Sequence, residues 1–105
     1  CFFSKRYYSS FMTIEQEDIK RSEIFKVLSD PNRLKMIRIL YDSGREMTCG
    51  EVGEKLNLSK STVSYHFKIL RSVGLTNTRK SAQSKYLSIN FATFKQYLPG
   101  FLDSL

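Results

Sequence analysis

The chain has 105 residues, of which 41% are hydrophobic and 26% charged, and this length and composition are typical of one folded domain. Its apolar runs are far shorter than the roughly 20 residues of a membrane-spanning helix, and its two cysteines are too few for a disulfide framework. We therefore expect a cytoplasmic protein without a membrane segment, whose net charge of +7 points to an acidic partner.

Residues 1–12 are predicted to be an N-terminal extension of uncertain origin, and residues 13–105 to form the domain. The domain opens with a helix over residues 14–30, which carries its acidic residues early, as the helix dipole favours. Apolar residues recur along this helix with roughly helical spacing and predict one buried face: Ile14, Ile19, Ile24, Phe25 and Leu28.

A second helix is predicted between Asp30 and Gly44. Asp30 is a favourable N-cap, Pro31 suits the first helical position, and a glycine commonly ends a helix. One side of this helix is lined by Leu34, Ile37 and either Leu40 or Tyr41.

The third predicted helix is short and follows a possible short strand at residues 45–47. Thr48 and Glu51 have the spacing of a capping box, in which each side chain binds the backbone of the other residue. The inward residues of this helix are Val52, Gly53 and Leu56.

Ser59 is predicted to cap a fourth helix over residues 60–73, which Gly74 ends. A turn of about three residues separates it from the third helix, and this is the spacing of a helix-turn-helix motif. Its buried face is predicted from residues at i, i+4 and i+7: Val63, Phe67 and Leu70.

The last third of the chain is predicted to form a hairpin and a final helix. Residues 75–79 and 85–89 favour strands, with the polar residues 80–84 as their loop. Asn90 can cap the final helix, and Pro99 should kink or split it. This helix carries a wide apolar stripe: Phe91, Phe94, Leu98, Phe101, Leu102 and Leu105.

The distribution of charge favours nucleic acid as the partner. No aspartate or glutamate occurs from residue 55 to residue 102, whereas eight lysines or arginines do. Such an acid-free stretch produces a positive field of the kind that attracts DNA. A hairpin after a helix-turn-helix makes a winged helix, so we predict that the fourth helix enters the major groove.

The residue types at the start of the fourth helix fit that role. Short hydroxyl side chains let a helix approach the bases closely and can donate or accept hydrogen bonds at their edges, and lysines on the helix and hairpin can bind phosphate. The residues predicted to contact DNA are Ser59, Lys60, Ser61, Thr62, Ser64, Tyr65, Lys68, Arg79, Lys80 and Lys85. We expect His66 to be a hydrogen-bonded packing residue rather than a base contact.

Two motifs carry a resemblance to a known family. The segments LSDPNRLKMIRIL (residues 28–40) and LNLSKSTVSYHFKILRSVGL (residues 56–75), with the hairpin after them, resemble the arsenic-repressor (ArsR/SmtB) family of bacterial transcription factors. The resemblance covers about residues 25–89. It implies a mainly α winged helix-turn-helix fold with five helices and a β-hairpin wing. It also implies a repressor that binds an inverted-repeat DNA operator until an inducer, unidentified here, releases it.

The resemblance further implies a homodimer formed by the first and last helices. The apolar stripe on the last helix supports this, because it is wider than a monomer of this size can cover. The predicted interface residues are Ile14, Phe91, Phe94, Leu98, Phe101, Leu102 and Leu105.

The metal sites of the family are not predicted in this chain. Thr48 and Gly50 stand where the family's thiol site has its two cysteines, with Cys49 between them. The last helix, where another family site uses aspartate and histidine, has only Asp103 and no histidine. We therefore predict no metal and no cofactor.

Two alternatives to a simple DNA-binding regulator stay open. Cys49, at the start of a helix, could have a lowered pKa and sense redox conditions. The winged helix could instead serve only protein–protein interaction, although the acid-free stretch argues against this. An enzyme is the least favoured class, because no nucleophile–base pair has suitable spacing.

Overall fold

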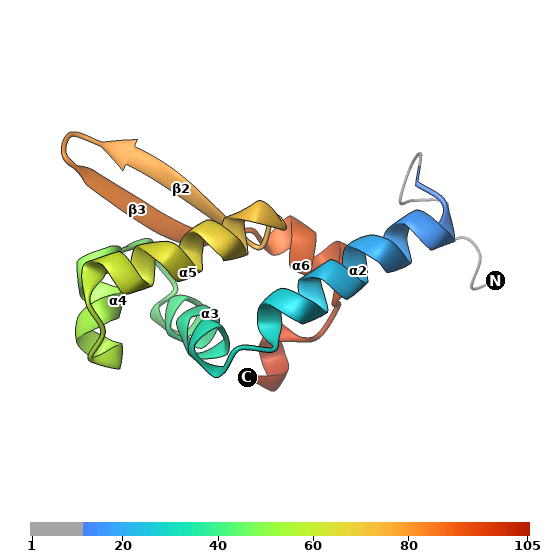
Figure 1. The fold of residues 1–105 in the computed structure, drawn as a ribbon, viewed down its shortest axis with the longest axis horizontal. Coiled ribbons are helices and arrows are strands. Elements are labelled where there is room, and N and C mark those ends of the chain that lie inside the picture. Colours follow the sequence, from blue (N-terminus) through green and yellow to red (C-terminus); the bar gives the residue numbers. More distant parts are fainter. Residues whose placement is uncertain (1–11) are drawn as a thin grey trace.

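The computed structural model describes residues 12–105, and these form five α-helices, a three-stranded antiparallel sheet and a final 3-10 turn (Figure 1). The mainly α winged-helix fold predicted from the sequence is confirmed, while residues 1–11 of the predicted extension lie outside the described residues. The elements in chain order are α2 (Ile14–Leu28), α3 (Pro31–Ser43), β1 (Met47–Thr48), α4 (Cys49–Leu56), α5 (Lys60–Ser72), β2 (Thr76–Ser81), β3 (Ser84–Ile89), α6 (Phe91–Tyr97) and η1 (Leu102–Ser104).

Short-range capping signals determine where the helices begin. The carboxylate of Asp30 accepts a hydrogen bond of 2.7 Å from the backbone N–H of Asn32, and the capping box between Thr48 and Glu51 is complete. Ser59 accepts a hydrogen bond from the N–H of Thr62, as predicted for the N-cap of α5. These side chains satisfy backbone donors that have no partner inside the helix.

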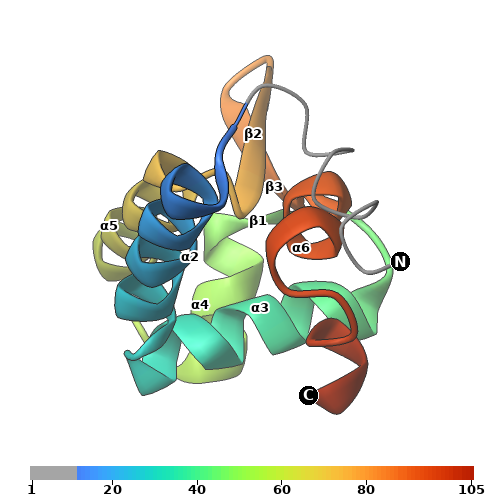
Figure 2. The ribbon, with the colours of Figure 1, turned by 90° about the vertical axis from the view of Figure 1, so that its right-hand side faces the viewer.

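One hydrophobic core joins the helices to the sheet. Figure 2 shows α2 and α5 on one side, α6 on the other, and α3 running across the base of the molecule. β3 is the central strand and pairs with both β1 and β2, so that Met47 lies opposite Leu87 in the buried part of the sheet. Met36 of α3 is fully buried as well, although the predicted inward side of this helix consists of Leu34, Ile37 and either Leu40 or Tyr41.

The first helix differs from its prediction because only part of its apolar set is buried. Ile24 and Leu28 lie in the core, whereas Ile14, Ile19 and Phe25 are exposed. Figure 1 shows why: the N-terminal half of α2 extends past the rest of the molecule. Ile14 and Ile19, which lie in this half, therefore have little of the protomer to pack against. Phe25 lies in the other half of the helix, where its neighbours Ile24, Val27 and Leu28 face the core instead.

The hairpin is longer than predicted, and its turn is tighter. Strands β2 and β3 continue to Ser81 and from Ser84, so only Ala82 and Gln83 form the turn. Ala82 takes a left-handed backbone conformation (φ 55°), which a non-glycine residue rarely adopts. Lys80, Ser81 and Ser84, predicted in the loop, therefore belong to the strand ladder.

The C-terminal stripe is divided between the protomer's own core and its surface. α6 ends at Tyr97, two residues before Pro99, as the proline predicts. Phe94 and Leu102 were predicted at the dimer interface, but they are only 2% and 9% exposed within the protomer, and the ring of Phe94 stacks on that of Phe101. The break at Pro99 lets the chain return over the core, which covers these two side chains.

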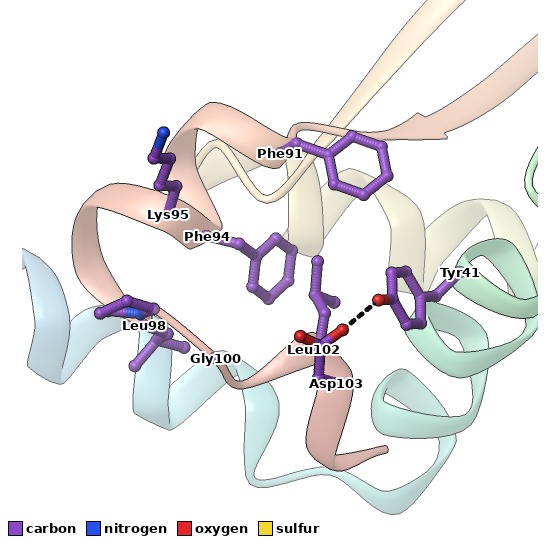
Figure 3. Close-up of a pocket in the computed structure, with 9 residues that line it drawn as sticks. Tyr41, Phe91, Phe94, Lys95, Leu98, Gly100, Leu102 and Asp103 are labelled. Carbon is purple, nitrogen blue, oxygen red and sulfur yellow. Dashed lines mark hydrogen bonds between the residues drawn. The ribbon is translucent and has the colours of Figure 1, made fainter.

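The remaining stripe residues lie at or near the surface. Phe91 is 58% exposed, whereas Leu98, Phe101 and Leu105 are half-buried against the core. Beside them is a hollow of about 300 Å³ (Figure 3). Across it, the Tyr41 hydroxyl of α3 donates a hydrogen bond to the Asp103 carboxylate, which fastens η1 to α3 and raises the pKa of Tyr41.

Candidate nucleic-acid interface

A close approach between α4 and the turn after it sets the position of α5. Three residues join the two helices. The first, Asn57, is left-handed (φ 57°), and the second, Leu58, donates its N–H to the carbonyl of Gly53 at 2.9 Å. A Cβ atom at residue 53 would lie 2.6 Å from the carbonyl oxygen of Leu58. Only glycine therefore allows this turn and this packing of α4 against α5.

Helix α5 has a buried side and a polar side. Val63, Phe67 and Leu70 are at most 1% exposed, which confirms the predicted buried face. The predicted DNA-contacting side chains of this helix lie on the other sides: Ser59, Lys60, Ser61, Ser64, Tyr65 and Lys68 are exposed, and Thr62 is half-buried. The helix therefore offers hydroxyls and lysines to an approaching partner while its apolar side anchors it.

The hydroxyl groups at the start of α5 form a small hydrogen-bonded group. The Ser59 hydroxyl lies 2.9 Å from the Thr62 hydroxyl and 3.1 Å from the Ser61 hydroxyl. Because a hydroxyl can both donate and accept, each can exchange such a contact for one to a base edge. The first turn is therefore held by these hydrogen bonds in the free protein, while its hydroxyls can still bond a base edge.

His66 is a packing residue, as predicted. Its side chain is buried, and its Nδ1 accepts a hydrogen bond of 3.2 Å from Nε of Arg33 in α3. The same guanidinium donates to the carbonyl of Val27 near the end of α2, also at 3.2 Å. Arg33 thereby links α2, α3 and α5, and the His66 ring in turn makes an edge contact with the exposed ring of Tyr65.

Of the three wing residues predicted to contact DNA, Arg79 forms an ion pair with another residue of the chain, whereas Lys80 and Lys85 form none among residues 12–105. Its guanidinium bonds both carboxylate oxygens of Glu46, at 3.0 and 2.8 Å, and lies over the ring of Tyr86. These bonds lower the pKa of Glu46. Arg79 therefore braces the wing against the loop before β1. Because its charge is balanced by Glu46, it is a weak candidate for phosphate binding.

Lys80 and Lys85 remain available on the wing. They lie directly opposite each other in the β2–β3 ladder, and both are exposed. Within residues 12–105 neither lysine forms an ion pair. Sequence reasoning could not separate them from Arg79, because Glu46 is 33 positions away from that arginine in the chain.

Cys49 lies at the start of α4, half-buried between that helix and the wing. Burial raises the pKa of its thiol, and the nearby Lys85 and Lys60 only partly oppose this effect. The redox alternative needed a lowered pKa, so the structure weighs against it. No group of three or more metal-binding side chains occurs in the part of the chain that the structure describes.

Comparison with known proteins gives a consistent result. Residues 28–79 match a family model described as a helix-turn-helix domain. The uncharacterized HTH-type transcriptional regulator YceK of Bacillus subtilis is 59% identical over 99 residues, covering 93% of this chain and 99% of YceK. The arsenical resistance operon repressor of Staphylococcus xylosus is 35% identical, covering 78% of this chain and 76% of that protein.

A solved structure agrees with these sequence relatives. HlyU from Vibrio cholerae is similar with a TM-score of 0.69 and 30% identity, covering 88% of this chain and all of that one. No helix among residues 12–105 has the length and hydropathy needed to cross a bilayer.

Proposed function

This chain belongs to the arsenic-repressor (ArsR/SmtB) family of winged-helix transcriptional regulators, and from that premise we propose that it acts as a homodimeric repressor. Each protomer places α5 in the major groove at one half-site of an inverted-repeat operator in double-stranded DNA. The observation that carries the proposal is the outward side of α5, where small hydroxyls and lysines are exposed next to a wing with two unpaired lysines.

Different side chains of α5 are suited to contacting the bases and the phosphate backbone of DNA. Ser61, Thr62 and Ser64 are short enough to reach base edges when the helix enters by its N-terminus. Tyr65, 59% exposed, can pack on a thymine methyl or reach a phosphate. Lys68 on the helix and Lys80 on the wing supply charge toward the backbone. Base contacts then carry the sequence information, while phosphate contacts carry affinity and register.

Exposed apolar side chains support the dimer. Among residues 12–105, five large apolar or aromatic side chains are 47–62% exposed, and four of them lie on α2 and α6, the helices predicted to dimerise: Ile14, Ile19, Phe25 and Phe91. The fifth, Tyr65, belongs to the proposed DNA surface. Exposed apolar surface on the two helices that are predicted to dimerise is typical of an interface. Because Phe94 and Leu102 lie in the core, we propose that the dimer contact involves Phe91 and the N-terminal half of α2 instead.

The experiment that tests the function is selection of bound sequences from random duplex DNA, followed by a salt titration on the selected duplex. Selection should return an inverted repeat, because a dimer with two-fold symmetry reads two equivalent half-sites. If each protomer neutralises three or four phosphates, log K against log salt should have a slope of roughly −5 to −7. A slope near zero, or no enriched sequence, would contradict the proposal.

Substitutions on α5 and on the wing should have different effects. Thr62→Ala and Ser64→Ala should each cost about 1–3 kcal/mol on the selected operator and little on random DNA, because they remove base contacts. Lys80→Ala should weaken both kinds of DNA alike and reduce the salt slope by about one unit per protomer. Fluorescence anisotropy with both duplexes measures these effects.

The assignment fails if Lys80→Ala changes which sequences are selected while the two α5 variants do not. Thermal unfolding serves as the control for all three variants. Each side chain lies outside the core formed by Val63, Phe67 and Leu70, so the melting temperature should change little.

A further inference from the structure

A hollow of about 440 Å³ opens where α4, α5 and β3 meet, at the side of α5 that faces the wing. In Figure 1 the hairpin formed by β2 and β3 lies above α5, and α4 lies at the N-terminal end of α5. Cys49 and Gly50 contribute from the start of α4, Lys60 and Ser64 from α5, and Lys85 from β3. None of the side chains that line the hollow is acidic.

Two lysines gather at this hollow, and among residues 12–105 no acidic side chain lines it. Glu51, the acidic residue in the first turn of α4, is bonded to Arg45 and to the Thr48 N–H. Lys60 and Lys85 form no ion pair within residues 12–105, in contrast to Arg45 and Arg79, each of which bonds a glutamate. Both lysines lie close enough to Cys49 to lower the pKa of its thiol against the larger effect of burial. Such a concentration of like charge favours a bound anion.

The start of α4 adds to this positive field. The N–H groups of Cys49 and Gly50 belong to the first helical turn, which has no intrahelical acceptors for them and carries the positive end of the dipole. A Cβ atom at residue 50 would lie 3.1 Å from Cε of Lys60. The lysine chain therefore lies against this glycine, and its ammonium is brought to the same helix terminus.

The path of DNA supplies the anion. In the proposed complex, with α5 in the major groove and the wing beside it, the sugar–phosphate strand between the major and the minor groove would cross the cleft between α5 and the wing. This cleft continues from the hollow into a second one of about 270 Å³, lined by Lys68, Arg71 and again Lys85. A strand on this path would therefore pass over basic residues in both hollows.

We propose that the hollow between α4, α5 and β3 is a phosphate site, in which one phosphate of the DNA backbone is held jointly by Lys60, Lys85 and the N-terminus of α4. This inference rests on the proposed function, and it adds that α4 takes part in binding and that two lysines far apart in sequence share one phosphate. The site would fix the distance between the recognition helix and the wing on the DNA.

Placing a carboxylate in the hollow provides the first test. Gly50→Asp puts a negative charge where the phosphate should lie, and an acidic residue in the first turn of a helix favours folding. We expect DNA binding to fall at least tenfold relative to Gly50→Asn, while the melting temperature of the Asp variant equals or exceeds that of the Asn variant. Asparagine fills almost the same space without charge. Equal DNA binding by the two variants would overturn the phosphate site.

The salt dependence of lysine variants provides the second test. If Lys60 and Lys85 share one phosphate, Lys60→Gln and Lys85→Gln should each leave the salt slope nearly unchanged, because the other lysine still neutralises it. The double variant should then reduce the slope by about one unit per protomer. Slope changes of about one unit for each single variant, and about two for the double variant, would mean separate phosphates and overturn the proposal.

A third measurement separates backbone phosphate from free phosphate. Potassium phosphate, added to the DNA complex at constant ionic strength, should displace no more DNA than potassium chloride does. Specific displacement by inorganic phosphate would assign the hollow to a free anion instead. A wild-type protein that binds no selected duplex would contradict the proposed function itself. The Gly50 comparison, in contrast, can contradict the phosphate site while DNA binding by the wild type stands.

Discussion

A protein carrying Phe91→Glu is expected to be a monomer and to bind its operator roughly 10²- to 10⁴-fold more weakly than the wild type, because linkage of two half-site contacts is lost. Phe91 is the most exposed residue of the C-terminal apolar stripe and lies at the first position of α6. A carboxylate there would have to be desolvated in an apolar interface without a partner, which is strongly unfavourable. Each free protomer would then bind only one half-site.

The choice of Phe91 follows from the burial of its neighbours. Phe94 and Leu102 belong to the core, so substitutions there would unfold the protomer and leave the cause of lost binding ambiguous. Gln96→Glu is the matched control, because Gln96 is exposed on the same helix and lies well away from Phe91 around its axis.

Sedimentation equilibrium at micromolar concentration and anisotropy with the selected operator measure the two effects together. The control variant should remain a dimer with nearly normal affinity and melting temperature. The Phe91→Glu variant should keep its helical circular dichroism but melt below the wild type, because it loses the stabilisation that dimerisation adds. A monomeric wild-type protein, or a Phe91→Glu variant that dimerises normally, would contradict the proposed interface.

The elements of this fold were predictable because the signals that start and stop its helices are local. Asp30, Thr48 and Ser59 each bond a backbone N–H two or three residues further along the chain. The helical spacing of Val63, Phe67 and Leu70 likewise depends on one element alone. Interactions of such short range are encoded in neighbouring residues, so the sequence suffices to find them.

Two features could not be predicted, because they depend on residues far apart in sequence. An apolar stripe has the same sequence pattern whether the chain itself or a partner covers it, so the sequence predicts Phe94 at an interface although its side chain lies in the core. A basic residue on a wing looks available for phosphate until its partner is known, and Arg79 is held by Glu46.

The proposed phosphate site also depends on residues far apart in sequence, but here the sequence predicts each residue's role and misses that they lie together. Lys60 and Lys85 could be predicted separately as DNA contacts, because each lies in the acid-free stretch. Their meeting at one hollow with Gly50 depends on how β3 passes α5. Residue type indicates the chemistry that a side chain can perform, whereas the packing of elements decides which side chains act on the same group.

Gly53→Ala is expected to be the most damaging single-methyl change in the helix-turn-helix. Its Cβ would lie 2.6 Å from the backbone carbonyl oxygen of Leu58, which cannot move without breaking the bond from the Leu58 N–H to the residue 53 carbonyl. Overpacking of this kind costs about 1–3 kcal/mol. For a domain of this size, each kcal/mol lowers the melting temperature by about 4–8 °C. DNA binding should also weaken, since α5 is displaced relative to the wing.

Gly50→Ala, three residues earlier in the same helix, is the control that separates the clash with the Leu58 carbonyl from the general effect of replacing glycine by alanine. There the added Cβ would crowd the flexible end of Lys60, at 3.1 Å, and would make an ordinary contact of 3.8 Å with the Thr48 hydroxyl. Alanine also favours the helix by up to about 1 kcal/mol over glycine. The two substitutions add the same atom to the same helix but should change stability in opposite directions. Calorimetric melting of both variants tests this. If Gly53→Ala melts at or above the temperature of Gly50→Ala, the turn does not require the close approach of α4 to Leu58, and the geometry that positions α5 must be held elsewhere.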